Sequence, residues 1–547
     1  IGIIGLWKSD TESDISVISE WEETIVLAHN AQNNRLLIIT ESFHSENLSS
    51  SSALLFICEQ KMPCFYCNVT MELATDDLNI DSMVSIRSKF SLNLEMESSG
   101  NEKIELALKK LESRFDVSSS EENDKSTRIL SNVYKHGNFL IADDASSSYA
   151  FPENLNYDTA TLLDLLKLQN IEGEKKSRRK SFSFVKDHLD FSLLQNITPK
   201  HDPESVKYIP IIHHEIAEFT KTTLPVTFLP LSICSVYTPL CELPILLNEA
   251  VLRQIKCARL SLFASFNETS DLVILRPYTF CLSNFGHFLT IYYPSNSTDE
   301  SLESCRQQII REWNLPSDRP TVRKNNTFCF PDETGNCLRN VHLEVGTSGS
   351  SRRIQATVYG NYQYHHYMQD NFDDKGWGCA YRSFQTIWSW FLLQGYTAKP
   401  VPSHGQIQQA LIDIGDRPQN FFGTKQWIGS LELSYCLSHL LQVESKILNV
   451  SSGSELTQKV RELIAHFEIE GTPIMIGGGV LAHTILGVHF CEETGDVKYL
   501  VLDPHYVGEE NAKTIVDKGW CGWKPSSFWT SDTFYNLLLP QRPKNMF

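Results

Sequence analysis

Residues 373–390 read DDKGWGCAYRSFQTIWSW and place one cysteine, Cys379, between a glycine-rich turn and an amphipathic segment. Gly376 and Gly378 disfavour regular structure before the cysteine, whereas the apolar residues from Phe384 onward follow the i, i+3, i+4, i+7 spacing of a buried helical stripe. The pattern therefore predicts a helix that begins at Cys379. The unpaired amides and the positive dipole end of a helix N-terminus stabilise a thiolate, so Cys379 is a candidate nucleophile. The alternative is a buried structural cysteine, which is the more usual role for a cysteine taken at random.

A candidate base for this cysteine ends a later segment, DVKYLVLDPHY at residues 496–506, which alternates like a β-strand. Side chains two positions apart in a strand point the same way, so Asp503 and His505 are expected to leave the strand end together. Pro504 fixes its own φ and keeps Asp503 extended, which holds the pair stiffly. A cysteine nucleophile needs a base, and the base needs an acceptor that fixes its tautomer. Cys379, His505 and Asp503 can fill these roles, although a solvent-facing turn also often carries Asp, Pro and His.

Other residues compete less well for these roles. His483 and His489 lie in apolar segments without a nearby acid in sequence, and we expect them to be hydrogen-bonded core histidines. Cys521 also follows a Gly-Trp pair, but the Lys-Pro-Ser segment soon after it cannot open a helix. The glycine run 477–479 lacks the Gly-Lys-Ser/Thr ending of a phosphate loop, so a turn between strands is expected there.

The composition is that of a globular protein with packed cores. The chain has 547 residues, of which 41% are hydrophobic and 11% aromatic, enough for about three domains. Its net charge of −18 argues against a nucleic-acid surface and would suit a basic partner. Fourteen cysteines are too sparse for a disulfide scaffold, so we expect reduced cysteines in a cytosolic protein. The pair Cys64 and Cys67 has no second pair at zinc spacing, and no metal site or cofactor is expected.

Two uncharged stretches, 471–490 and 224–241, have about the length of a membrane span. The first contains glycines and β-branched residues, which favour two buried strands joined by a glycine-rich turn. The second contains Pro225, Pro230 and Pro239, which would break a helix repeatedly. We therefore expect no transmembrane segment, and any membrane contact would have to come through a partner.

Three blocks and a linker are expected along the chain. They are 1–190, the linker 191–205, 206–346 and 347–547. In the first block, the apolar runs 36–40 and 53–58 predict strands, and the spacing over 104–115 predicts a helix. In the second, 288–293 is expected as a strand and 302–313 as a helix. The residues that could carry chemistry lie in the third block.

Six segments of the third block, in chain order, resemble the ubiquitin-fold-modifier-specific cysteine proteases. They are YHHYMQD at 364–370, GWGCAYRS at 376–383, QWIGS at 426–430, GGGVLAHTILGV at 477–488, DPHY at 503–506 and LPQRP at 539–543. A further segment, LPSDRP at 315–320, is similar to the longer of the two forms of this family. The resemblance covers essentially all of the third block, whereas the N-terminal blocks resemble the family much less.

The resemblance implies an α+β fold in which a papain-like cysteine protease domain at the C-terminus follows α/β N-terminal domains. It implies a thiol protease that matures the modifier precursor and removes the modifier from conjugated target lysines, without a cofactor or a metal ion. By the same resemblance, Cys379 is the nucleophile, His505 the base, Asp503 the residue that orients it, and Tyr367 a donor to the oxyanion. On the sequence pattern alone, Tyr367 would more simply be a packed aromatic residue.

The first block, 1–190, is expected by analogy to be an MPN-like domain for substrate or adaptor recognition. No His-x-His pair occurs in the sequence, so such a domain would lack the zinc ligands of active MPN peptidases. The expected partners are the ubiquitin-fold modifier, its conjugates and an adaptor in the endoplasmic-reticulum membrane, with no nucleic acid. The expected location is the cytoplasm, in association with the endoplasmic reticulum through that adaptor.

Two other functions remain open at the level of the sequence. Autophagy-modifier cysteine proteases share Gly-Trp-Gly-Cys and Asp-Pro-His, but the YHHYMQD segment before the cysteine favours the ubiquitin-fold-modifier branch. A protein of another class, an adaptor or scaffold that uses its long N-terminal part, would not need catalysis. Against a loss of catalysis, every residue that the mechanism needs is present.

Overall fold

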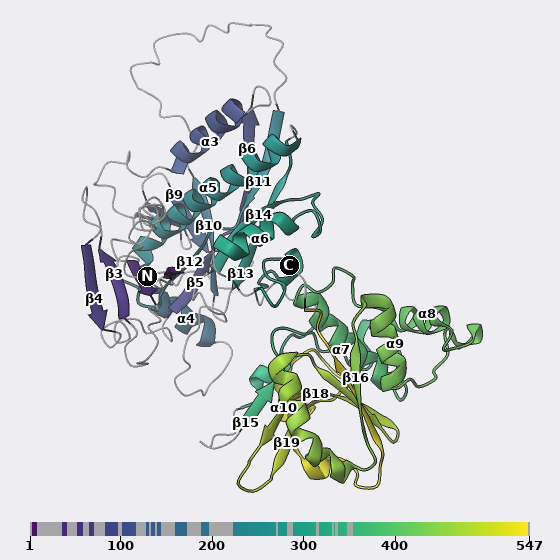
Figure 1. Ribbon diagram of the computed structural model, residues 1–547. Helices are drawn as coiled ribbons and strands as arrows, with labels where there is room; N and C mark the ends of the chain where they lie inside the picture. The colour runs from purple at the N-terminus through teal and green to yellow at the C-terminus, as the bar shows by residue number, and fades with distance from the viewer. Residues whose placement is uncertain are drawn as a thin grey trace, which may run out of the picture. The chain divides into compact units, whose positions relative to one another are not determined.

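The computed structural model describes a set of segments that includes nearly all of the C-terminal third of the chain. The described residues are 3–7, 36–40, 52–57, 65–70, 83–96, 101–115, 127–130, 133–136, 139–143, 159–171, 188–195, 222–269, 272–281, 288–312, 315, 317–330, 333, 337–346 and 354–544. The chain divides into two compact units, Ile1–Leu302 and Glu303–Phe547 (Figure 1). The pair of cysteines weighed as a zinc motif falls partly outside the described residues, because Cys64 is not among them.

Helix α7 (Cys379–Leu393) begins at the cysteine, as the apolar spacing predicted. Gly378 precedes the helix, and a Cβ at this position would lie 2.6 Å from Cβ of Asp374, so the turn requires a glycine. The helix is buried on every side along most of its length because it packs against the central sheet of the second unit. Cys379 is therefore fixed at the start of a core helix rather than on a surface loop.

The second unit is built on an antiparallel sheet of seven strands. In spatial order, six of them are β16 (Ser445–Val450), β21 (Tyr535–Pro540), β17 (Ile474–Gly478), β18 (Leu481–Phe490), β19 (Val497–Leu502) and β20 (Cys521–Pro525). The seventh, β15 (Ile354–Thr357), pairs with β18.

Strands β17 and β18 form the hairpin that the sequence predicted over 471–490. In β18, every residue from Ala482 to His489 is buried, which explains why this stretch carries no charge. Among the helices of the described residues, none combines the length and the apolar character that a membrane crossing needs.

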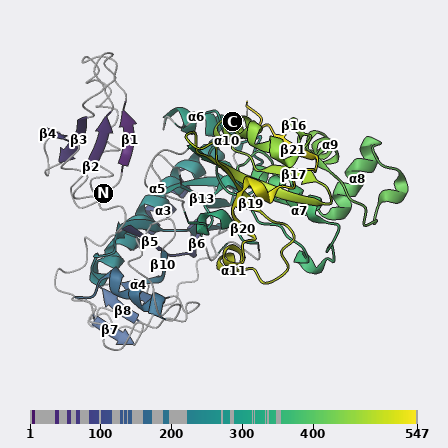
Figure 2. The same ribbon diagram turned by 90° about the horizontal axis from the view of Figure 1, so that it is seen from below.

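Helices pack against this sheet (Figure 2). Helices α7 and α9 (Ser430–Leu441) contact β17, and α10 (Val460–Ile469) contacts β15 and β18. The other helices of the unit are α6 (Glu303–Glu312), α8 (His404–Ile414), α11 (Ala512–Asp517) and the short 3-10 helices η5 (Lys324–Asn326), η7 (Val341–Glu344), η8 (Gln369–Asn371), η9 (Gln419–Phe421), η10 (Gly453–Lys459) and η11 (Ser526–Phe528).

Residues 303–346 fall within the second unit, although the sequence grouped them with the block 206–346. Val341 is fully buried in the same hydrophobic core as helix α7. The backbone amide of Asn340 donates a hydrogen bond to the carbonyl of Tyr362 at 3.2 Å. The composition of a stretch does not indicate which of two neighbouring hydrophobic cores its apolar residues join. The sequence therefore could not assign residues 303–346 to the second unit.

The first unit combines helices with several sheets. Its strand orders are β1-β2-β3-β4, β12-β5-β10-β9-β8-β7, β11-β6 and β13-β14. The strands are β1 (Ile3–Trp7), β2 (Leu36–Thr40), β3 (Ser52–Ile57), β4 (Phe65–Thr70), β5 (Met83–Arg87), β6 (Phe90–Met96), β7 (Thr127–Leu130), β8 (Val133–His136), β9 (Phe139–Asp143), β10 (His188–Gln195), β11 (Thr222–Phe228), β12 (Leu231–Ser235), β13 (Leu275–Cys281) and β14 (Phe288–Pro294). The helices that the structure describes in this unit are α3 (Asn101–Phe115), α4 (Leu162–Ile171), η4 (Leu240–Glu242) and α5 (Leu243–Thr269).

Buried aliphatic residues join α3 and α5 to strands β6 and β11 in one core. Strands β2 and β3 and helix α3 lie where the sequence predicted two strands and a helix. Strand β10 occupies the first part of the stretch expected as a linker, 191–205. The unit is thus a mixture of helices and strands, and its MPN-like character stays a prediction.

Candidate active site

The thiol of Cys379 lies at the first position of α7 and is 8% exposed. Burial raises the pKa of this thiol, but a hydrogen bond and the charge of His505 outweigh burial and bring the pKa below its ordinary value. Hydrogen bonds from the side chain of Tyr367 and the backbone of Ala482 act in the same direction. The site therefore favours the thiolate, which is the nucleophilic form of cysteine.

His505 and Asp503 follow strand β19, which ends at Leu502. Nδ1 of His505 lies 2.5 Å from Oδ1 of Asp503, and the backbone amide of His505 donates to the same oxygen at 3.0 Å. The carboxylate therefore keeps a proton on Nδ1 and leaves Nε2 for Cys379. Nε2 is buried and has no conventional hydrogen-bond partner among the described residues, and the group with which it interacts is the thiol of Cys379.

The charges of this pair suit a thiolate beside an imidazolium. Burial lowers the pKa of His505, but the hydrogen bond with Asp503 and the interaction with the Cys379 thiol raise it to about 9. Burial raises the pKa of Asp503, yet the hydrogen bond from His505 brings it below its ordinary value. Asp503 thus stays ionised, and His505 holds a proton that it can deliver to a leaving group.

Backbone contacts hold the Asp503 segment in place. The amide of Asp503 donates to the carbonyl of Trp520 at 2.8 Å, and the carbonyl of Asp503 accepts a hydrogen bond from the hydroxyl of Tyr364. The amide of Tyr367 donates to the carbonyl of Pro504 at 2.9 Å. The segment that carries the histidine and its acid is therefore also the one that fixes Tyr367 beside them.

Tyr367 is buried, and its ring meets the ring of His505 edge-on with the centroids 5.2 Å apart. Burial and then the negative charge of Cys379 raise the pKa of its phenol, so the hydroxyl keeps its proton. The hydroxyl lies near enough to the thiol of Cys379 for each group to shift the pKa of the other. A protonated hydroxyl next to the sulfur is a suitable donor to the negative oxygen that forms when the sulfur adds to a carbonyl carbon.

His483 lies closer to the candidate triad than the sequence suggested. Its Nε2 is 3.7 Å from Oδ2 of Asp503, and its ring centroid is 5.3 Å from that of His505. Burial lowers the pKa of His483 to about 4, so the ring is neutral near neutral pH. The ring packs edge-on against Phe528 and Trp529, as expected of a core histidine. The nearby acid that the sequence around His483 lacks is Asp503, which follows the neighbouring strand β19. Its Oδ2 faces His483, whereas its Oδ1 is bound to His505.

The other two rivals lie in the core. His489 is buried in β18 and packs edge-on against Trp523, with the centroids 5.9 Å apart. Cys521 is fully buried in β20, and burial raises the pKa of its thiol to about 12. A thiol of that kind is almost never ionised near neutral pH, so the structure favours Cys379 as the nucleophile.

Within the described residues, one cluster has the donor atoms of a metal site. Donor atoms of His483, Asp503 and His505 all lie within 4.8 Å of one another. Nδ1 of His505 and Oδ1 of Asp503 are already joined by a hydrogen bond of 2.5 Å. A metal ion would have to replace this bond, so the geometry fits a catalytic triad better than a metal centre.

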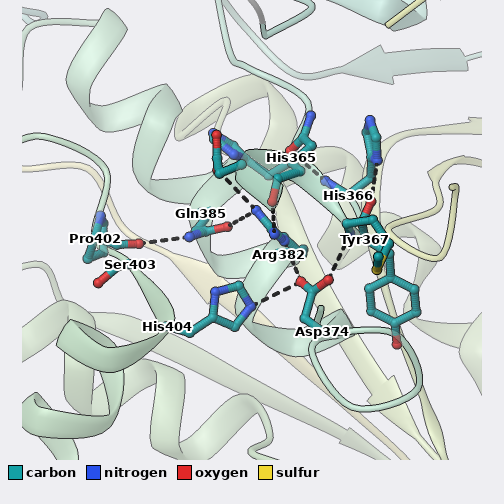
Figure 3. Close-up of polar contacts among 12 residues, drawn as sticks. His365, His366, Tyr367, Asp374, Arg382, Gln385, Pro402, Ser403 and His404 are labelled. Atoms are coloured by element: carbon teal, nitrogen blue, oxygen red, sulfur yellow. Dashed lines mark hydrogen bonds and ion pairs between the residues drawn. The ribbon is translucent and has the colours of Figure 1, made fainter. Parts of the chain in front are cut away.

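Sequence reasoning missed a buried polar cluster behind Tyr367 (Figure 3). The fully buried Asp374 accepts hydrogen bonds from Nε of Arg382 at 2.5 Å and from the amide of Met368 at 2.8 Å. Nε2 of His404 lies 3.1 Å from the same carboxylate. Burial raises the pKa of Asp374, but its hydrogen bonds, first that with His404, bring the pKa below its ordinary value. Asp374 before the cysteine and Arg382 after it are both visible in the sequence, but no sequence pattern indicates that they form a buried ion pair.

Two family models match the chain. One, described as peptidase family C78, matches residues 353–538. The other, described as the N-terminal region of ubiquitin-fold modifier 1 specific protease 2, matches residues 134–335. All four candidate site residues, Tyr367, Cys379, Asp503 and His505, lie within the first match.

Proteins with curated names are similar to about half of the chain. A Gallus gallus protein named Ufm1-specific protease 2 is 52% identical over 279 residues, which make up 51% of this chain and 61% of the relative. A Danio rerio protein of the same name is 50% identical over 283 residues, which make up 51% of this chain and 71% of the relative. The chain thus spans about three fifths of the length of the first of these relatives.

A solved structure is similar over most of the chain. The crystal structure of UfSP from C. elegans matches with a TM-score of 0.67 and 31% sequence identity, over 89% of this chain and 86% of that one. The mixture of helices and strands predicted from the sequence is therefore confirmed as a fold of the same kind as that protein's.

Proposed function

The chain belongs to the family of Ufm1-specific proteases, and from this premise we propose that it is a cysteine protease for the ubiquitin-fold modifier 1. It matures the modifier precursor at the modifier's C-terminus and removes the modifier from conjugated target lysines. The observation that carries this proposal is the convergence of Cys379, His505 and Asp503. The thiol stands at a helix start, and the imidazole that faces it is held by the carboxylate at 2.5 Å.

The first half of the reaction transfers the modifier's acyl group to Cys379. The thiolate adds to the carbonyl carbon of the scissile bond, forms a C–S bond and moves an electron pair onto the carbonyl oxygen. His505 then gives its Nε2 proton to the leaving amine as the C–N bond breaks, while Asp503 stabilises the imidazolium before that transfer. The raised pKa of His505 keeps this proton available until the amine takes it.

Water completes the second half. The neutral His505 takes a proton from water, and the oxygen adds to the thioester carbonyl. The C–S bond then breaks, which releases the modifier's carboxyl group and restores the thiolate of Cys379. Precursor and conjugate can share these steps, because a peptide bond and an isopeptide bond to lysine both join a carbonyl to an amine.

Tyr367 has a role in both halves under this proposal. Each tetrahedral intermediate carries a negative oxygen, and the phenol donates a hydrogen bond to it together with a backbone amide at the cysteine. What supports the assignment is the buried position of the phenol, which lies edge-on to the His505 ring with the centroids 5.2 Å apart and interacts with the Cys379 thiol. Because the bond matters most when charge develops on the oxygen, it acts on kcat more than on substrate affinity.

The region before the protease domain at 347–547 is proposed to choose substrates and location. The MPN-like domain 1–190 and the region 206–346 would bind an adaptor in the endoplasmic-reticulum membrane and keep the cytoplasmic protein beside it. Support comes from the segment 315–320, which is similar to the longer family form, and from the match of residues 134–335. Cell fractionation tests this idea: the protein should sediment with microsomes, and recovery only in the cytosolic fraction would contradict it.

Activity probes separate the proposed function from its two alternatives. The probes are the ubiquitin-fold modifier 1, ubiquitin and an autophagy modifier, each with an electrophile at its C-terminus. The proposal expects covalent labelling by the first probe alone. Comparable labelling by the autophagy probe would favour an autophagy-modifier protease, and a folded protein that no probe labels would favour an adaptor or scaffold.

A further inference from the structure

The turn that follows Tyr367 has an unusual backbone. Met368, Asp370 and Asn371 have φ angles of 63°, 58° and 56°, which lie in the left-handed region that side chains rarely adopt. Asp and Asn tolerate this region because their short polar side chains bond locally, but Met has no such compensation. A backbone of this kind persists only where its surroundings hold it, and such turns gather at functional sites. The contacts that hold this turn are therefore candidates for a role in catalysis.

One anchor of the turn comes from the helix that carries Cys379. Nη2 of Arg382, in the first turn of α7, donates a hydrogen bond to the carbonyl of Gln369 at 3.1 Å. Asp374 accepts from the amide of Met368, and Figure 3 shows its carboxylate between Arg382 and His404. The turn is thus tied to the cysteine side of the site through groups that are fully buried.

A second anchor comes from the loop that carries His505. Glu510 lies five positions after this histidine, and its Oε1 accepts hydrogen bonds from Nε2 of His366 at 2.9 Å and from Nε2 of Gln369 at 2.7 Å. These two donors flank Tyr367, one immediately before it and the other two positions after it. Glu510 therefore connects the loop of the base to both sides of the tyrosine.

The ring of His366 also contacts the backbone of Tyr367. Nδ1 of His366 lies 2.9 Å from the carbonyl oxygen of Tyr367, and its Nε2 faces the carboxylate of Glu510. Both are oxygens that only accept hydrogen bonds, and the ring of His366 lies between them. The side-chain oxygen of Gln369 accepts from the amide of His366 at 3.0 Å and closes the ring of contacts. The backbone around Tyr367 is thus bound to Glu510 through one side chain on each route, that of His366 or that of Gln369.

We propose that Glu510 is a positioning residue, which ties the His505 loop to the turn around Tyr367 and so holds the phenol beside Cys379. The proposal rests on the function proposed above, in which Tyr367 serves the oxyanion. It assigns Glu510 no contact with the substrate or the reacting atoms. It also gives the YHHYMQD segment a physical purpose, because His366 and Gln369 present the donors that Glu510 accepts.

A simple surface ion pair would be the alternative for Glu510. Its side chain is 30% exposed, and exposed ion pairs contribute little to stability. Its two donors, however, are buried: His366 is 2% exposed and Gln369 8%. Loss of the acceptor would leave two buried donors without this partner, which perturbs a structure more than loss of an exposed charge pair. Removal of Glu510 should therefore loosen the turn locally rather than the fold as a whole.

The test compares full-length variants of one position with a matched neighbour. Glu510→Ala removes the acceptor, whereas Glu510→Gln keeps an oxygen that can accept from both donors. Glu509→Ala removes the adjacent exposed carboxylate and is the control for charge. Glu510→Ala combined with Tyr367→Phe shows whether the glutamate acts through the tyrosine. Each variant is measured for deuterium exchange of the amides of residues 366–371, for kcat and KM on a modifier fusion, and for alkylation of Cys379 by iodoacetamide.

In Glu510→Ala, we expect faster exchange over residues 366–371 and a fall in kcat of about tenfold, with KM and the alkylation rate changed by less than about twofold. Glu510→Gln and Glu509→Ala should stay within about threefold of the parent protein in kcat. In the Tyr367→Phe background, Glu510→Ala should lower kcat by less than about twofold more, because two residues that act as a unit are not additive.

Unchanged exchange over residues 366–371 in Glu510→Ala would overturn the proposal, whatever the activity. A full additional tenfold loss in the double variant would also overturn it, because the glutamate would then act through another group. A parent protein that does not cleave the modifier would refute the proposed function instead. In that case the exchange measurement would still decide whether Glu510 holds the turn around Tyr367.

Discussion

His505 and Asp503 stand two residues apart in the chain and share a hydrogen bond of 2.5 Å between Nδ1 and Oδ1. Pro504 lies between them and restricts the backbone. Its carbonyl accepts a hydrogen bond from the amide of Tyr367. The proposed base and the acid proposed to orient it therefore come from one short, stiff segment. The rest of the fold has to align that segment with only two other groups, the thiol of Cys379 and the phenol of Tyr367.

Replacement of each histidine near this segment distinguishes the base from its neighbour. His505→Ala should be nearly inactive on a modifier fusion because it removes the imidazole that exchanges a proton with the Cys379 thiol and the leaving amine. His483→Ala should cost much less, since this ring is neutral and contacts the outer oxygen of Asp503. Steady-state kinetics and a circular dichroism spectrum of each variant are the measurements. A folded, inactive His483→Ala beside a His505→Ala of normal activity would mean that the wrong base has been chosen.

Asp503→Asn should keep the fold and lower kcat by about a thousandfold or more, by analogy with the serine-protease triad. The amide can present a donor to Nδ1, which favours the wrong tautomer of His505. A variant within about tenfold of the parent protein in kcat would show that the acid does not orient the base.

The pH profile of the parent protein should be bell-shaped. Activity should rise as pH passes through the pKa of Cys379, which lies below the ordinary 9.0, and fall as pH passes about 9, where His505 loses its proton. In Asp503→Asn, the upper limb should fall at a lower pH, because the hydrogen bond that raises the pKa of His505 is lost. An upper limb at the same pH in both proteins would contradict this assignment.

Tyr367→Phe keeps the ring and its buried area but removes the donor. The oxyanion role predicts a loss on the order of 10²–10³ in kcat, or about 2.7–4 kcal/mol of transition-state stabilisation, with little change in substrate affinity. A packed aromatic residue without a catalytic role predicts almost no change. Steady-state kinetics decides, and a kcat within about threefold of the parent protein, a barrier change below ~1 kcal/mol, would refute the oxyanion role.

Asp374→Asn should destabilise the second unit by about 3–5 kcal/mol, because it removes the buried counter-charge of Arg382 and leaves only the exposed Asp370, 3.6 Å away. The pKa of Asp374 is lowered in the folded protein, so its contribution is complete above the ordinary 3.8 and is lost as pH falls through the lowered value. The urea midpoints of the two proteins should therefore converge at acidic pH. Asp373→Asn, an exposed neighbour 3.8 Å from Lys425, is the control and should change stability by less than about 1 kcal/mol. Equal effects of the two substitutions would contradict the buried role of Asp374.

The parts of the site that the sequence predicted are those with a local signal. The start of α7 at Cys379 follows from glycines before it and apolar spacing after it. The placement of Asp503 and His505 follows from strand alternation and an intervening proline. The role of Tyr367 depended on the family resemblance, because a tyrosine in an aromatic-rich segment has no signal of its own. The structure adds the geometry that is compatible with this role.

The parts that the sequence could not predict depend on contacts between distant segments. Asp374 and Arg382 are close in sequence, but their burial depends on His404 of another helix. Glu510 resembles any exposed acid until the fold brings it to His366. Left-handed Met368 has no sequence signal either, because glycine and asparagine are the residues that normally indicate this conformation.

The identity of the nucleophile is the central claim, and cleavage of a modifier C-terminal fusion by cysteine variants tests it most directly. The parent protein and Cys521→Ser should cleave the fusion at similar rates, provided that the buried serine leaves the fold intact. Cys379→Ser should not cleave it, although it should keep the fold and bind the modifier, because a hydroxyl is far less acidic than the thiol that it replaces almost isosterically. Retained turnover in Cys379→Ser, together with a folded but inactive Cys521→Ser, would contradict the account.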